Sequence, residues 1–516
     1  MPRILAAGTF LLLVCGLGTP SIAQPAPRAR ATLTEAQRLI EAGRFDAARA
    51  RLEPLTAKKD PAAAVAAYLL GTIEERLGRR DEAAAAYERA LAADPELAVA
   101  HDRLGFVRGQ QGRTADALRH FERASALDPD LFDAHYHLGA TRWWTKDAAG
   151  ARAPLERAVA LRPDHPEARY YLGLVLKQLG ERDAALAALE QAARDGPTLA
   201  PIHLHLGVLR HELGDIDGAT AALERAVELD PSSADARNSL ALVLVQRGRA
   251  DEAERLLQSI LEEDPSHAVA MLNLGMSQLQ RGDLSAAVAT LEELVKRHPS
   301  SAEGHYNLGM ALKQQDRFDE AERALRTAIA LDPSLPDAPF TLGVVLWQTG
   351  RAEEAEPLFR TALAADPDSA DAHYMLGVVL RQRGRLDEAL AQFDKAVELR
   401  PTLAEAHLAR GQLLQQRGDA AAAAEAFARH RELGQRKADA QASTFAVGVG
   451  REKLKQGDLD GAMAQFREAI RLAPDNPQAH YELAMALRRA GKAQEAAPHF
   501  AEAQRLAPWL KPPPGA

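Results

Sequence analysis

The stretch "AEGHYNLGMALKQQDRFDEAERALRTAIALDPSL", residues 302–335, is one copy of a pattern that repeats along the chain. Its apolar residues recur at intervals of three and four on both sides of Asp316, which is the spacing of two amphipathic helices. The "DP" pair ends the second helix, because proline disfavours the helical conformation of the residue before it. The stretch therefore predicts a pair of helices.

The proline of this stretch belongs to a series with a period of 34 residues. When each repeat begins 31 residues before its proline, position 7 is usually leucine, position 8 glycine or alanine, position 15 glycine and position 20 alanine. Small residues at positions 8 and 20 let antiparallel helices approach closely, and the glycine at position 15 caps the first helix. The series contains Pro61, Pro95, Pro129, Pro163, Pro197, Pro231, Pro265, Pro299, Pro333, Pro367 and Pro401, followed after a slip of five residues by Pro474 and Pro508.

A chain of 516 residues is too long for one compact core. Hydrophobic residues make up 47% of it but aromatic residues only 5%, which favours many small contacts between helices over one thick core. A single helix pair leaves half of its apolar surface bare, and stacked neighbours cover that face. The sequence therefore predicts an all-α solenoid.

The repeat resembles the tetratricopeptide repeat, whose motif has small residues at positions 8, 20 and 27, bulky residues at 4, 7, 11 and 24, and proline at 32. This resemblance implies a right-handed α-solenoid superhelix of antiparallel helix pairs, with about 14 repeats. The expected boundaries are an atypical first repeat at 29–63, repeats 2–12 in unbroken phase at 64–437, an insertion at 438–442, repeats 13 and 14 at 443–510, and a proline-rich tail at 511–516.

Departures from the motif predict irregular places. Three of them fall in the twelfth repeat, where Arg410 replaces the leucine at position 7, His430 the small residue at 27 and Gln435 the proline. We expect an overlong second helix there and a change in the path of the solenoid. Lys146 and Asp316 replace the glycine at position 15, so we expect those two turns to be strained or differently capped.

Residues 1–23 are predicted to be a cleaved secretory signal, because Arg3 precedes a mostly apolar core of 15 residues and small residues precede Gln24. Two alternatives remain, an uncleaved anchor and lipidation of Cys15, the single cysteine. Residues 24–28 would form a short linker. The mature protein is therefore expected in the periplasm or secreted, or else attached to the membrane through its N-terminus.

The sequence gives no sign of catalytic chemistry. The net charge is −9 and no basic block occurs, so nucleic acid and anionic membrane surfaces are not expected partners. Phosphate-binding glycine loops, serine elbows, zinc-protease motifs and complete calcium loops are missing from the sequence. We therefore predict no catalytic residues, no metal site and no cofactor.

The "HYN" triplet that begins at His305 is predicted to be structural, because a histidine recurs at position 4 of seven repeats. Equivalent residues of adjacent repeats lie about 8–10 Å apart, too far for two nitrogens that share one zinc ion. We expect each imidazole to act as a half-buried wedge. The seven are His101, His135, His203, His305, His373, His407 and His480.

The resemblance implies that positions 2, 5, 9, 12 and 13, and often 6, line the concave face. We hypothesise a groove with a row of amides beside an apolar, tyrosine-rich strip, since amides donate to and accept from a peptide backbone. The alternative is that glutamine, a good helix former, was inherited from repeat to repeat. The candidate residues are Gln110, Gln178, Gln246, Gln280, Gln314, Gln348, Gln382 and Gln416 at position 13, Asn273 and Asn307 at position 6, Tyr136, Tyr170, Tyr306 and Tyr374 at position 5, and Trp143 and Trp347 at position 12.

The expected function is a non-catalytic protein–protein interaction scaffold of the cell envelope, which binds an extended peptide or a partner protein in the concave groove. The alternative is a recruiting or regulatory subunit of an envelope enzyme complex for polysaccharide synthesis, polysaccharide export or glycosyl transfer. The basic and asparagine residues of the family's two-carboxylate clamp are missing, so a chaperone C-terminus is not the expected ligand.

Overall fold

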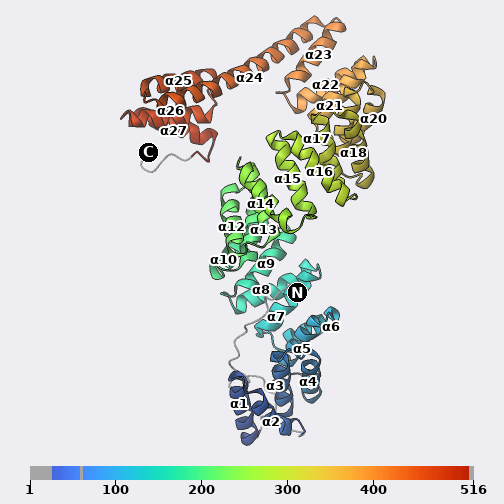
Figure 1. The fold of residues 1–516 in the computed structure, drawn as a ribbon, viewed down its shortest axis with the longest axis vertical. Helices are drawn as coiled ribbons and strands as arrows, with labels where there is room; N and C mark the ends of the chain where they lie inside the picture. The colour runs from blue at the N-terminus through green and yellow to red at the C-terminus, as the bar shows by residue number, and fades with distance from the viewer. Residues whose placement is uncertain (1–25, 58–61, 511–516) are drawn as a thin grey trace. The chain divides into compact units, whose positions relative to one another are not determined.

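The computed structural model describes residues 26–57 and 62–510. These residues form 27 α-helices and contain no strand (Figure 1). The all-α solenoid that the sequence predicts is thereby confirmed. No helix within the described residues is both long and apolar enough to span a bilayer. The predicted signal at 1–23 and the tail at 511–516 lie outside the described residues.

The chain divides into two compact units, Met1–Asn273 and Leu274–Ala516, and the boundary falls within helix α15. In the first unit, seven helix pairs follow one another, and from α1 to α14 each helix packs against the next. The helices are α1 (Pro27–Glu41), α2 (Phe45–Thr56), α3 (Ala62–Arg76), α4 (Arg80–Ala93), α5 (Ala98–Gln110), α6 (Thr114–Leu127), α7 (Phe132–Trp144), α8 (Ala148–Leu161), α9 (Pro166–Gln178), α10 (Arg182–Asp195), α11 (Ala200–Glu212), α12 (Ile216–Leu229), α13 (Ala234–Gln246), α14 (Ala250–Glu263) and the start of α15 (Ala268–Arg281).

The second unit continues the same pattern of first and second helices. Its first helix α19 directly contacts the first helices α17 and α21 on either side, and each of the three also packs against its own second helix. The helices are α16 (Leu284–Arg297), α17 (Ala302–Gln314), α18 (Phe318–Leu331), α19 (Ala338–Gln348), α20 (Ala352–Ala365), α21 (Ala370–Gln382), α22 (Leu386–Leu399), α23 (Ala404–Gln416), α24 (Ala420–Lys455), α25 (Leu459–Leu472), α26 (Pro477–Arg489) and α27 (Ala493–Leu506).

Close approach of the two helices explains the glycine at position 8. A Cβ atom added at Gly309 would lie 2.6 Å from Cγ of Leu325, the position-24 residue of the second helix. At Gly377 the added atom would lie 2.6 Å from a ring carbon of Phe393. The large residue at position 24 therefore occupies the space that a side chain at position 8 would need.

The turn between the two helices requires a left-handed residue at position 15. Glycine fills this position in twelve repeats with φ between 71° and 84°. Lys146 and Asp316 adopt the same conformation, with φ of 65° and 58°. Side chains in this conformation cost about 1–2 kcal/mol, so the two predicted irregular turns are strained and keep the geometry of the others.

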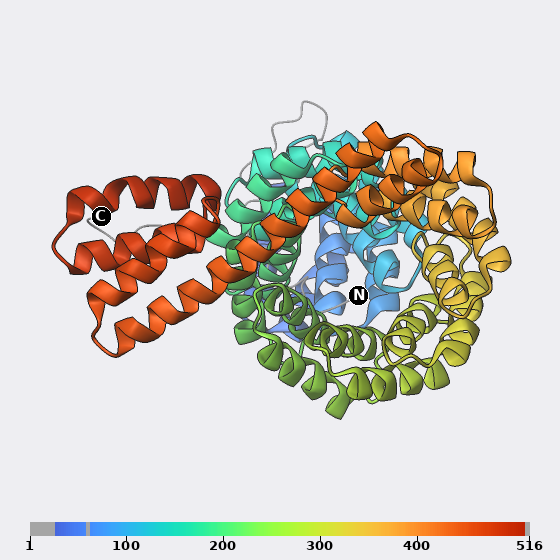
Figure 2. The same cartoon turned by 90° about the horizontal axis from the view of Figure 1, so that it is seen from above.

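Helix α24 joins the second helix of the twelfth repeat to the first helix of the thirteenth. It runs for 36 residues, and the insertion at 438–442 does not interrupt it. Its first part packs on α23 and its last part on α25 and α26 (Figure 2). The sequence predicts an overlong helix here but does not show that it continues through the first helix of the next repeat. As a result, Phe445 is 75% exposed at position 3, where other repeats bury an alanine such as Ala406.

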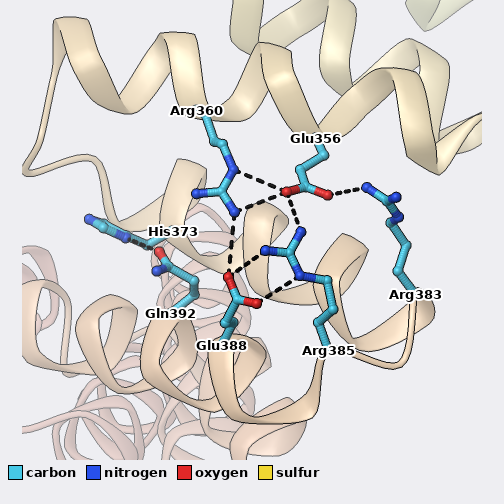
Figure 3. A network of polar contacts seen from close by, with 7 residues as sticks. All are labelled: Glu356, Arg360, His373, Arg383, Arg385, Glu388 and Gln392. Atoms are coloured by element: carbon cyan, nitrogen blue, oxygen red, sulfur yellow. Dashed lines mark hydrogen bonds and ion pairs between the residues drawn. The ribbon is translucent and has the colours of Figure 1, made fainter.

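Ion pairs connect successive repeats of the second unit. The carboxylate of Glu356 accepts hydrogen bonds from Arg385 at 2.7 Å and from Arg360 at 2.9 Å, and Arg383 reaches its other oxygen (Figure 3). Arg385 also binds Glu388 of its own repeat. Burial raises the pKa of Glu356, but the arginines outweigh this effect and hold the pKa below its usual value. This network fixes the second helix of one repeat to the turn of the next.

Candidate peptide-binding surface

Positions 5, 9, 12 and 13 of the first helices lie on one helical face, because they are separated by multiples of three and four residues. We call the side chains at these four positions the first-helix surface. In the second unit, the central part of this surface lies on α17, α19 and α21. Because α19 contacts both α17 and α21, the three helical faces lie side by side. The polar hydrogen-bonding groups and aromatic rings proposed from the sequence can therefore be located on it.

The glutamine row is accessible. All eight position-13 glutamines are exposed, and seven of them are the last residue of a first helix. Gln280 lies one residue before the end of α15. Of these eight glutamines, only Gln110 has a hydrogen-bond partner within the described residues. Its amide oxygen accepts from Arg80 at 3.2 Å. In each unit, these amides thus lie at the ends of first helices, where a ligand can reach them.

The two asparagines are already engaged. Nδ2 of Asn273 donates to Oδ1 of Asn238 at 2.8 Å, and Asn273 is buried. Nδ2 of Asn307 donates to the carbonyl oxygen of Glu303, one turn earlier in α17, at 2.9 Å. These amides hold the first helices instead of pointing freely toward a ligand, and sequence spacing alone gave no sign of either contact.

An aromatic cluster occupies the first-helix surface of α7 and α9. Trp143 lies 5.5 Å from the ring of Tyr171 and 4.9 Å from Trp144, measured between ring centroids. Tyr170 lies against Tyr171 at 5.2 Å, whereas Tyr136 is almost fully buried. Trp144 replaces the position-13 glutamine and is 52% exposed. The structure therefore joins Trp143 and Tyr170 in one cluster, and adds Tyr171 to the residues that the sequence indicated.

In the second unit, Tyr306, Trp347 and Tyr374 are half-buried on α17, α19 and α21. Burial raises the pKa of Tyr306, and a hydrogen bond with Thr341 partly offsets that rise. The position-12 residues flanking Trp347 are Lys313 and Arg381, which the sequence interpretation did not single out. No group of three or more His, Cys, Asp or Glu side chains in the described part of the chain could hold a metal ion.

Family comparisons cover most of the chain. A family described as tetratricopeptide repeat matches residues 33–98, 146–200, 340–404 and 450–508. Two further tetratricopeptide repeat families match residues 302–335 and 109–143. The tetratricopeptide domain of cytochrome c-type biogenesis protein H matches residues 189–305. The chain belongs to the tetratricopeptide repeat family.

Several solved structures resemble parts of this tetratricopeptide repeat protein, while no curated protein matches it significantly. MamA 41-end from Desulfovibrio magneticus RS-1 is 27% identical over 32% of this chain and 94% of its own, with a TM-score of 0.31. PilF of Pseudomonas aeruginosa is 20% identical over 40% and 94%, with a TM-score of 0.38. YrrB, described as having an unusual peptide-binding site, is 20% identical over 43% and 95%, with a TM-score of 0.29.

Arrays of this family are protein-interaction scaffolds, and the position-4 histidines of this tetratricopeptide repeat protein serve its architecture. In each of the seven, Nε2 lies 3.0–3.2 Å from the carbonyl oxygen of the proline six residues earlier. Arg169 makes the equivalent contact with Pro163, whereas Arg237 donates to the carbonyl oxygen of Ser232, one residue after the proline. Position 4 thus supplies an N–H donor to the turn between repeats. The constant spacing of six residues between proline and histidine was the sequence signal for it.

Side chains at positions 5 and 6 of α5 and α7 in the first unit make polar contacts within the protein. Oδ1 of the buried Asp102 lies 2.8 Å from Nδ1 of His137. Arg103 donates to Glu75 at 2.5 Å, and Tyr87 donates to the same carboxylate at 2.8 Å. Because these polar groups bond to one another, they are not open to a ligand in this part of the tetratricopeptide repeat protein.

Proposed function

We propose that the protein is a non-catalytic scaffold of the cell envelope that binds an extended peptide segment of a partner along the first-helix surface. The observation that carries this proposal is the set of exposed position-13 glutamines beside half-buried aromatic rings. Apart from Gln110, which accepts from Arg80, none of these amides has a hydrogen-bond partner among the described residues. Each amide offers two donors and an acceptor, which is what an unpaired peptide backbone requires.

The spacing of the row suits an extended chain. Adjacent first helices are separated by about 8–10 Å, and an extended chain advances about 3.3 Å per residue. One glutamine would therefore meet about every third residue of the ligand. The rings of Tyr306 and Trp347 would cover apolar side chains between those contacts, which adds the burial that amides alone lack.

The envelope location rests on the sequence of residues 1–23. Mass spectrometry of the mature N-terminus after cell fractionation tests this part of the proposal. A chain that begins at Gln24 in the envelope fraction supports it, and a chain with an intact Met1 in the cytoplasmic fraction contradicts it.

The binding part is tested with a peptide selected from a random 12-residue library against the purified protein. The triple variant Gln314→Ala, Gln348→Ala, Gln382→Ala removes three adjacent amides without touching the helix core. Loss of about 1 kcal/mol for each hydrogen bond predicts at least a tenfold weaker affinity. The matched control replaces exposed glutamines elsewhere, Gln441, Gln456 and Gln504, and should bind normally. Equal affinity of both triple variants would contradict the proposal.

A further inference from the structure

Two lysines at position 12 have different surroundings. In α9, Nζ of Lys177 forms an ion pair of 2.7 Å with Glu212, the position-13 residue of the next repeat. The corresponding residue for Lys313 in α17 is Gln348, which carries no charge. Lys313 is half-buried and has no carboxylate partner in the described part of the chain. Burial lowers the pKa of its ammonium group, and no carboxylate acts against that effect.

A second cation lies at position 12 two repeats further on. Arg381 of α21 donates to the amide oxygen of Gln412 at 2.9 Å and forms no ion pair among the described residues. Trp347 occupies position 12 of α19, between these two cations. Positions 9, 12 and 13 of the three helices carry no acidic residue. This part of the first-helix surface therefore has two positive charges that the protein itself does not neutralise.

We propose that the surface of α17, α19 and α21 selects an acidic peptide, in which two carboxylate side chains flank apolar residues. One carboxylate would pair with Lys313 and the other with Arg381, while the apolar residues between them cover Trp347. The inference rests on the proposed function and adds the chemistry of the ligand. Partial burial of the cations strengthens such pairs compared with fully exposed ones.

The geometry sets the spacing of the two carboxylates. Lys313 and Arg381 are two repeats apart, which corresponds to about 16–20 Å at the usual distance between packed helices. An extended peptide covers that distance in about five or six residues. The acidic residues of the ligand are therefore expected about five or six positions apart.

A basic residue in the last turn of a helix also stabilises the helix by itself, through the partial negative charge at that end. Such a role would make Lys313→Ala lower the melting temperature without changing ligand preference. A role in ligand binding predicts that Lys313→Ala changes the ligand preference and leaves the melting temperature unchanged. The two roles are therefore separated by measuring thermal stability and binding on the same variants.

The test uses synthetic 12-residue peptides, acetylated and amidated so that they have no free terminal charge. One carries two glutamates six residues apart around a leucine–phenylalanine core, and the other has glutamine at both positions. At low salt, we expect the full-length protein to bind the glutamate peptide about fivefold to tenfold more tightly. The ratio of the two affinities should fall toward one at about 0.5 M sodium chloride, because added salt screens partly exposed charges.

Two variants and a control locate the effect. Lys313→Ala should reduce the preference for glutamate, and Gln348→Glu should do the same by giving Lys313 the partner that Lys177 already has. Lys177→Ala, which removes a lysine that is already paired, should leave the preference unchanged. Circular dichroism would confirm that the three variants keep the helicity of the parent.

Each outcome decides one claim. Equal binding of the glutamate and glutamine peptides, or an unchanged preference in Lys313→Ala, would overturn the acidic-ligand inference while leaving the proposed peptide-binding function in place. If neither peptide binds and the library yields none that does, the proposed function fails as well. A preference lost in both Lys313→Ala and Gln348→Glu but kept in Lys177→Ala supports the inference.

Discussion

Nε2 of His305 lies 3.1 Å from the carbonyl oxygen of Pro299, and the same relation recurs at position 4 of six other repeats. The histidine donates to the turn that separates its repeat from the preceding one. This hydrogen bond explains why a residue that looks catalytic in isolation recurs along a solenoid. It also makes position 4 a place where stability can be changed without touching the first-helix surface.

Replacing this donor should weaken the turn. His305→Phe keeps an aromatic ring but removes the N–H group, and we expect a loss of about 1 kcal/mol. His305→Arg should restore most of it, since Arg169 reaches Pro163 from the same position. The shift of the urea unfolding midpoint measures both variants. A stability of His305→Phe equal to that of the parent would show that the contact contributes nothing.

The half-buried histidines predict lower stability in acid. Burial lowers the pKa of His101, His120, His135, His203 and His499 below the ordinary value of 6.5. The folded protein therefore binds fewer protons than the unfolded chain when the pH falls below about 6.5. The contribution of the neutral histidines to the free energy of unfolding should be fully present above that pH and should decrease between pH 6.5 and 5. Melting curves at pH 7.5, 6.5 and 5.5 would reveal a flat profile if the prediction is wrong.

One histidine pair offers a matched variant for that pH profile. Nδ1 of His101 lies 3.0 Å from Nδ1 of His120, so only one of these nitrogens can carry a proton in the neutral pair. In the eleventh repeat, Gln392 occupies the place of His120 and lies 2.6 Å from His373 (Figure 3). His120→Gln should therefore fold normally and lose less stability between pH 6.5 and 5.5. A loss as large as that of the parent would mean that the pair does not contribute.

The two strained turns should tolerate glycine better than their natural residues. Lys146→Gly and Asp316→Gly relieve a left-handed conformation that costs about 1–2 kcal/mol, partly offset by the larger freedom of glycine in the unfolded chain. We expect each to stabilise the protein by about 0.5–1 kcal/mol. The reverse change, Gly350→Lys, provides the control and should destabilise. Denaturant midpoints that do not separate the two kinds of variant would contradict this account of the turns.

The Glu356 carboxylate should be a sensitive point of the second unit. Its side chain is 8% exposed, while the three arginines around it are 35–47% exposed. Glu356→Gln keeps the shape and removes the charge, and because water can reach the arginines we expect a loss of only about 1–2 kcal/mol. Glu388→Gln, on the exposed side of the same network, should lose less. An equal loss in both variants would argue against a special role for the buried carboxylate.

The period of 34 predicts the helix pairs because the features that define them are local. The proline and the position-15 glycine act within one repeat. The small residues act where the first and second helices of that repeat meet. The extent of α24 could not be deduced in the same way, since it depends on the missing proline at Gln435 together with helix-forming residues at 438–442. Here the sequence shows where the pattern fails but not which structure replaces it.

The site was only partly predictable for a related reason. The exposure of the glutamine row follows from helix geometry, so the sequence could indicate it. The engagement of Asn273 depends on Asn238, 35 residues earlier, and the unpaired charge of Lys313 depends on Gln348, 35 residues later. Such contacts between repeats become visible only when the equivalent positions of adjacent first helices are compared in space.

The most direct test of the central claim is to map where a bound peptide lies. A library-selected peptide with a photoreactive benzophenone at its centre is crosslinked to the full-length protein, and the attachment points are located by mass spectrometry. Binding along the first-helix surface predicts crosslinks on α17, α19 and α21, near Trp347 and the adjacent glutamines. Crosslinks confined to second helices such as α18 and α20 would contradict it.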